Sequence, residues 1–184
     1  MPSVLDSEIR SGRFTLLATL TVEPKLSLSG ELAHAFEAHH ALVFRTAYRI
    51  TGNAADAEDV LQTIFLRLLR RQEQEAVENQ EGYLRRAAVN ASLDLIRARR
   101  DDHAAECGNI PSGGRDPDAG ELRAALRRAL GRLNPKSAEI FSLRFLEGLS
   151  NQEIARLLGI SRVLVAVIVH RARRQLQHEL RDYR

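Results

Sequence analysis

The sequence predicts an all-α protein of two small helical domains joined by an acidic flexible linker, with a helix-turn-helix in the second domain. Apolar residues recur at helical spacing through most of the chain after residue 30. Only 5 Pro and 11 Gly interrupt the 184 residues, and this leaves room for long helices. Aromatic residues are sparse at 5% and Trp is absent, which also favours helices over many short strands.

The first domain is expected at residues 31–100, after an N-terminal extension at residues 1–30 that has no helical period. Its first helix should end near Ile50, because Thr51 and Gly52 provide a stop and Asn53 can cap the next helix. That second helix carries an apolar stripe made of Ala57, Val60, Leu61, Ile64, Phe65, Leu68 and Leu69.

The third helix of this domain has a narrow apolar arc opposite a polar side. The arc comprises Leu84, Ala87, Ala88, Ala91 and Leu95, and we expect it to face the core. Arg86, Asn90 and Arg97 project from the opposite side, and Arg85 and Arg100 lie on its flanks. The pattern predicts that these polar side chains are free to contact another molecule.

A linker is expected at residues 101–118 and the second domain at residues 119–184. In the second domain, Asn134-Pro135 marks the end of one helix and the start of the next. Ser150 with Glu153 forms a capping box, and the helix that it starts should end at Gly159. Ser161 then caps the last helix, so residues 150–161 predict a helix-turn-helix.

Positive charge is concentrated in two segments, although the net charge is only +3. Residues 83–100 carry five Arg against one Asp, and residues 156–184 carry seven Arg against two acidic residues. Two basic segments suggest two contacts with a polyanion, although each could also be an ordinary solvated face.

Composition and motifs argue against several other classes. The single cysteine, Cys107, excludes an intramolecular disulfide and fits a reducing cytoplasm. His103 and Cys107 lack two further ligands nearby, so no metal site is expected. The run "FTLLATLTV" is too short to span a membrane. No phosphate-binding glycine loop and no nucleophile with a plausible base is found, so we expect neither an enzyme nor a bound cofactor.

Three segments together resemble the extracytoplasmic-function sigma factors of bacterial RNA polymerase. They are "FRTAYRITGNAADAEDVLQTIFLRLLR", "GYLRRAAVNASLDLIRARR" and "LNPKSAEIFSLRFLEGLSNQEIARLLGIS", in this order and separation. The resemblance implies a first domain that binds the polymerase clamp and opens the minus-ten element, and a second that contacts the minus-thirty-five element. Implied partners are core RNA polymerase, promoter DNA and, as a further candidate, an anti-sigma factor.

The resemblance also assigns residues. The segment "DAEDVLQ" is similar to the family's clamp-binding helix. The resemblance therefore implies that the polymerase is bound by Asp56, Glu58, Asp59 and Gln62. Asn90 stands where the family contacts a promoter base, and nearby arginines would hold phosphates. The first-domain DNA-binding group is thus Arg85, Arg86, Asn90, Arg97 and Arg100.

The helix after Ser161 departs from the family pattern. Leu164, Ala166, Val167 and Ile168 stand where the family usually has polar residues. The core-facing positions are Val165, Val169, Ala172 and Leu176, and the outer positions are Val163, Ala166, Val167 and His170. The groups left for DNA are Arg162, His170, Arg171, Arg173 and Arg174. We therefore expect backbone binding with little base recognition.

Two alternatives to a sigma factor stay open. The first is a sigma-like regulatory adaptor whose second domain binds a protein through the exposed face at Val163 and Val167. The second is a stand-alone helix-turn-helix repressor, which the clamp-binding segment of the first domain disfavours.

Overall fold

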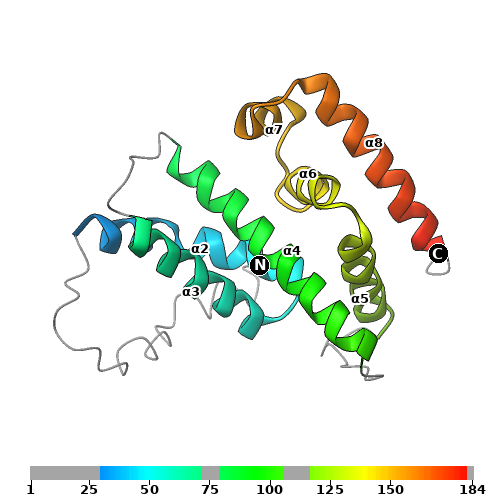
Figure 1. The fold of residues 1–184 in the computed structure, drawn as a ribbon, viewed down its shortest axis with the longest axis horizontal. Coiled ribbons are helices and arrows are strands. Elements are labelled where there is room, and N and C mark those ends of the chain that lie inside the picture. The colour runs from blue at the N-terminus through cyan, green and yellow to red at the C-terminus, as the bar shows by residue number, and fades with distance from the viewer. Residues whose placement is uncertain (1–29, 72–78, 106–116, 182–184) are drawn as a thin grey trace, which may run out of the picture. The chain divides into compact units, whose positions relative to one another are not determined.

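The computed structural model describes residues 30–71, 79–105 and 117–181, which form helices joined by short turns (Figure 1). The expected extension at 1–30 and Cys107 therefore fall almost wholly outside the described residues. The chain divides into a unit of residues 1–41 and a larger compact unit of residues 42–184. Spanning a bilayer would need a longer apolar run than any helix in the described ranges offers.

Helices α2 (Gly30–Thr51) and α3 (Ala54–Arg71) meet at the turn that the sequence predicts. Gly52 has a φ of 67°, and the Asn53 side chain accepts a hydrogen bond of 2.9 Å from the backbone N–H of Ala55. A left-handed glycine followed by a capping Asn ends one helix and starts the next. The apolar stripe of α3 is buried, as expected, at Ala57, Val60, Leu61, Ile64 and Phe65.

Helix α4 (Gln80–Ala105) differs from the expectation in length and in the width of its buried surface. Its backbone stays helical for five residues beyond residue 100, into the segment assigned to the linker. Val89 and Leu93 are fully buried together with Leu84 and Ala88, so the predicted narrow arc is wrong. The reason is that α4 packs against α3 and also against α5 (Pro117–Arg132) and α6 (Pro135–Phe145).

Residues on both sides of the linker share one hydrophobic core within the larger unit. Ile50 of α2 and Val89 and Leu93 of α4 belong to the same buried cluster as Leu130 of α5 and Ile140 of α6. The turn between α5 and α6 follows the expected pattern, because Asn134 accepts a hydrogen bond of 2.8 Å from the Ser137 N–H. Burial of these apolar side chains stabilises the packing of α4 against α5 and α6.

Helices α7 (Asn151–Leu158) and α8 (Arg162–Glu179) form the predicted helix-turn-helix (Figure 1). Both hydrogen bonds of the Ser150 and Glu153 capping box are present. Gly159 ends α7 with a φ of 64°, and the Ser161 hydroxyl accepts the Leu164 N–H at the start of α8. Local sequence therefore defines both helix ends of this turn.

Replacing Gly159 with Ala should lower the free energy of unfolding by about 1 kcal/mol, because its left-handed φ of 64° is unfavourable for a residue with a Cβ. Apart from the two neighbours of Gly159 in the chain, no atom of the described residues lies within 4 Å of the added Cβ, so a steric clash with them does not contribute. Gly159→Asn is the control, since Asn tolerates this conformation better. Urea unfolding followed by circular dichroism measures both; equal stability of the Ala variant and the parent would contradict the prediction.

Candidate nucleic-acid interface

Helix α4 places three of the predicted DNA-binding residues on one surface, which we call the α4 polar face: Arg85, Arg86 and Asn90. The helix begins where the Asn79 side chain accepts the backbone N–H of Gly82 at 2.8 Å. Residues 85, 86 and 90 then fall within one and a half turns, which brings their side chains to neighbouring positions. All three are partly buried.

A carboxylate from α6 binds two residues of the α4 polar face. Glu139 Oε1 accepts a hydrogen bond of 2.7 Å from Arg86 Nε and one of 3.1 Å from Asn90 Nδ2. Its other oxygen accepts 3.1 Å from Lys136 Nζ, and only 6% of the Glu139 side chain is exposed. Burial alone would raise the pKa of the Glu139 carboxyl, but hydrogen bonds from Arg86, Asn90 and Lys136 bring it below its ordinary value.

A second carboxylate, from the turn between α6 and α7, binds the remaining arginine of this face. Glu147 Oε2 accepts hydrogen bonds of 2.8 Å from Arg85 Nη1 and of 2.8 Å from the Thr46 hydroxyl on α2. Its Oε1 lies 3.2 Å from Arg49 Nη1, and the Glu147 side chain is completely buried. The Glu147 carboxylate therefore joins α2 and α4 to the second domain.

These contacts correct the expectation that the polar side of this helix is free. Arg97 pairs with Asp94 at 3.0 Å, and Arg100 Nη1 donates to the Gly131 carbonyl of α5 at 2.9 Å. Every predicted DNA-binding residue of α4 thus has a partner within the chain. Arg97 has its partner on α4 itself, whereas Arg86, Asn90 and Arg100 contact α6 or α5 because burial of Val89 and Leu93 brings these two helices close.

Sequence analysis did not identify Thr46, Arg49, Glu139 or Glu147 as part of this site. The contacts join residues that lie 49 to 101 positions apart in the chain, so helical periodicity carries no information about them. The excess of arginine in residues 83–100 indicated a need for anionic partners, but it did not distinguish an internal carboxylate from a phosphate.

The predicted polymerase-binding group is divided by the structure. Glu58, Asp59 and Gln62 are exposed on α3, whereas Asp56 is buried and both of its oxygens pair with Arg99 of α4. Asp56 lies in the first turn of α3, and its partner brings α4 against that turn. Asp56 therefore holds the first domain together, and the other three remain accessible to a partner.

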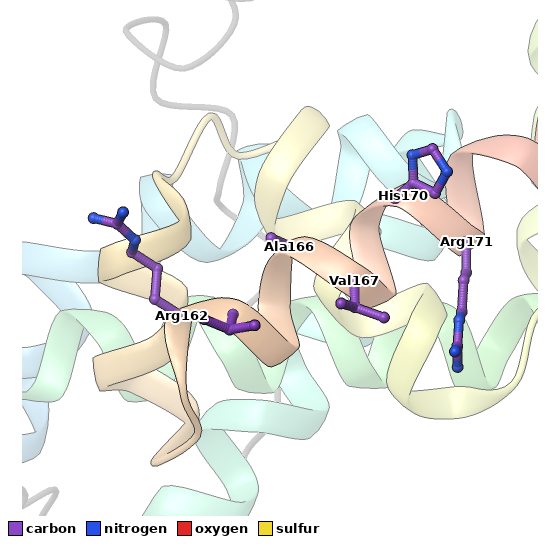
Figure 2. Close-up of a pocket in the computed structure, with 6 residues that line it drawn as sticks. Arg162, Ala166, Val167, His170 and Arg171 are labelled. Carbon is purple, nitrogen blue, oxygen red and sulfur yellow. The ribbon is translucent and has the colours of Figure 1, made fainter.

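Helix α8 separates core-facing from outer positions as the sequence predicts. Of the four positions predicted to face the core, Val165, Ala172 and Leu176 are buried and Val169 is partly buried. On the outer side, Val163 is 73% and Val167 39% exposed. We call the outward side, made of Val163, Ala166, Val167 and His170, the α8 outer face. It forms a shallow, mainly apolar hollow, with Arg162 at one end and Arg171 at the other (Figure 2). Arg173 and Arg174 are also exposed.

Glu139→Gln should lower the free energy of unfolding at pH 7 by on the order of 1–2 kcal/mol, because it removes the charge that two cations and an amide bind. The folded pKa lies below the ordinary value of 4.5, so this contribution is complete above pH 4.5 and disappears as pH falls through the folded value. Urea unfolding of parent and variant across this pH range measures the difference, and exposed Glu121→Gln is the control. A difference that stays constant down to strongly acidic pH would contradict the assignment.

Comparison with known proteins gives matches to both halves of the chain. The family model for Sigma-70 region 2 matches residues 35–101, and that for Sigma-70, region 4 matches residues 123–176. The first range includes α4 up to residue 101, and the second includes the helix-turn-helix up to residue 176.

Two sigma factors are identical to this chain at about a third of the aligned positions. The ECF RNA polymerase sigma factor SigE of Mycolicibacterium smegmatis is 34% identical over 153 residues, covering 79% of this chain and 58% of that protein. The RNA polymerase sigma-E factor of Streptomyces coelicolor is 34% identical over 144 residues, covering 75% of this chain and 79% of that protein. The chain thus spans between about half and four fifths of the length of such relatives.

A solved structure has the same fold. The sigma factor RpoE from Bartonella quintana, in complex with the anti-sigma factor NepR, superposes with a TM-score of 0.51 at 18% identity. The match covers 82% of this chain and 97% of that one.

Proposed function

Because the chain belongs to the extracytoplasmic-function sigma factors of bacterial RNA polymerase, we propose that it directs promoter recognition and transcription initiation as a subunit of that polymerase. The observation that best supports this proposal is the α4 polar face, whose donors bind carboxylate oxygens at 2.7–3.1 Å. Phosphate oxygens accept the same charge-assisted hydrogen bonds. The place of action would be the cytoplasm, where the polymerase works.

Within the first domain, we assign base recognition to Asn90 and phosphate binding to the arginines around it. An Asn amide offers a donor and an acceptor to an unstacked base, whereas Arg supplies charge to any sequence. The assigned phosphate-binding residues are Arg85, Arg86, Arg97 and Arg100. Their present partners are protein groups, so promoter binding requires those contacts to be exchanged for DNA.

Contact with core polymerase is assigned to the exposed acidic surface of α3. Glu58 and Asp59 are accessible near the N-terminal end of that helix, and Gln62 lies one turn further on. Such carboxylates complement a basic surface on a partner protein. Asp56 is excluded from direct contact because its carboxylate is buried against Arg99.

In the second domain, α8 is proposed to bind the DNA backbone with little base recognition. Exposed Arg162, Arg171, Arg173 and Arg174 supply phosphate contacts, with His170 beside them. The α8 outer face offers few hydrogen-bonding groups to base edges. The same apolar surface favours the alternative function, a sigma-like regulatory adaptor. In that function a partner protein covers Val163 and Val167.

Asp59→Arg should weaken binding to core polymerase at least about tenfold, because it places a cation where the partner is expected to be basic. Fluorescence anisotropy of labelled protein titrated with core polymerase measures the affinity, and run-off transcription on genomic fragments measures the function. Glu121→Arg, a charge reversal at another exposed position, on α5, is the control. If folded Asp59→Arg binds core with the parent's affinity, α3 does not contact the polymerase.

Asn90→Ala should cost about 1–3 kcal/mol of promoter binding at a single minus-ten position, whereas Arg97→Ala should weaken all promoter variants about equally and reduce the salt dependence. The measurement is open-complex formation by the assembled holoenzyme on a set of single-base promoter variants, across a salt series. If the Asn90→Ala holoenzyme retains the parent's order of preference at every position, base recognition must be assigned to another residue.

A further inference from the structure

The apolar part of the α8 outer face lies in the first two turns of that helix. Val163, Ala166 and Val167 are exposed there, while Val165 between them is buried on the other side. In a helix-turn-helix, the N-terminal residues of the second helix are the ones that contact base edges in the major groove. The apolar side chains therefore stand at the positions from which a helix of this kind reads DNA.

The charges around this face complement a polyanion. Helix α8 carries four arginines and one acidic residue, Glu179, which is its last residue. Arg162 and Arg171 lie at opposite ends of the apolar hollow (Figure 2). They are nine positions apart, which is roughly 14 Å along a helix axis, and the major groove of DNA is about 12 Å wide. Both guanidinium groups can thus reach phosphates at the walls of a groove while the apolar centre faces the bases.

Thymine presents an apolar group in the major groove. Its C5-methyl lies there, whereas adenine, guanine and cytosine present hydrogen-bonding groups without a methyl. A valine placed against those groups leaves them without a partner, which costs free energy. An apolar face therefore favours thymine twice, through contact with the methyl and through rejection of the other bases.

We propose that Val163 and Val167 recognise the C5-methyl groups of thymines in promoter DNA, so that α8 selects A·T base pairs by apolar contact. The proposal rests on the proposed function, because it requires α8 to contact promoter DNA, and it adds the chemical group that α8 recognises. The two valines are four positions apart, roughly 6 Å along the helix, and successive bases of one strand are about 3.4 Å apart. The target is therefore a short run of A·T base pairs.

The size of the preference follows from the small area of a methyl group. Burial of one such group strengthens binding about fourfold. Phosphate contacts from the arginines of α8 then supply most of the affinity, and the methyl contacts supply a modest preference. Methyl recognition is thus consistent with an α8 that makes few hydrogen bonds to bases.

The first experiment removes thymine methyl groups from a preferred duplex. The full-length chain selects from a library of random-sequence duplexes, and sequencing of the bound fraction gives the enriched sequence. Each thymine of that duplex is then replaced by deoxyuridine, which lacks the methyl and retains the O4 acceptor. Fluorescence anisotropy should show about fourfold weaker binding at one or two neighbouring thymines and the parent affinity at the others.

The second experiment adds the same methyl to another base. At a contacted position, the T·A base pair is replaced by C·G, with either cytosine or 5-methylcytosine in the thymine strand. The methyl of 5-methylcytosine occupies the same place in the groove as that of thymine. We expect 5-methylcytosine to bind more tightly than cytosine, by a factor similar to the one lost with deoxyuridine.

The third experiment changes the protein. Val163→Ser/Val167→Ser should bind the thymine and deoxyuridine duplexes equally, because both apolar contacts are lost. Ser and Val have similar helix propensities and both positions are exposed, so α8 should stay folded, which circular dichroism verifies. Leu66→Ser/Leu122→Ser, which makes the same kind of change at exposed positions of α3 and α5, is the matched control and should keep the preference. Arg171→Ala should weaken both duplexes alike.

The outcomes separate methyl recognition from the proposed function. If no sequence is enriched, or if deoxyuridine binds as tightly as thymine at every position, methyl recognition is wrong. It is also wrong if Val163→Ser/Val167→Ser keeps the parent's preference for thymine. If this variant binds every duplex as the parent does, the α8 outer face does not contact DNA, and the adaptor alternative is favoured instead. Failure of the proposed function gives a different result, since the parent would then direct no run-off transcription with core polymerase, whatever its preference among duplexes.

Discussion

A carboxylate that is completely shielded from water can exist only with compensating donors, and the described residues supply Glu147 with three of them, from two helices. Thr46 and Arg49 come from α2 and Arg85 from α4, so one buried charge determines how three segments meet. Loss of any one donor leaves the charge undercompensated, which costs more than the intact cluster contributes. The packing of α4 against α6, with Glu139 in the same interface, depends on that compensation.

Two arginine-rich stretches of the same molecule therefore differ in what their side chains contact. Residues 83–100 and 156–184 are both rich in arginine, but the arginines of the α4 polar face bind carboxylates while those of α8 are exposed to solvent. Net charge of a segment does not determine which state it adopts. The difference arises from neighbours, because α4 is covered on two sides and α8 on one.

Features defined by local sequence could be predicted, and features defined by distant partners could not. The turn at Gly52 and Asn53 and the Ser150 capping box depend on residues within four positions, and the structure agrees with both. The burial of Val89 depends on α5 and α6, which a helical wheel of α4 alone does not include. Asp56 illustrates the same limit within one domain, since its partner Arg99 lies 43 residues away.

The separation of Asn90 and Glu139 along the chain also has a consequence during synthesis of the protein on the ribosome. Glu139 is added to the chain 49 residues after Asn90, which at ordinary rates of bacterial translation is a delay of about 2–10 s. During that interval the nascent first domain has the apolar surface at Val89 and Leu93 without its later cover from α5 and α6. Each newly made molecule thus passes through a stage in which its arginines and this apolar surface are available to nucleic acids, chaperones or polymerase before its own second domain exists.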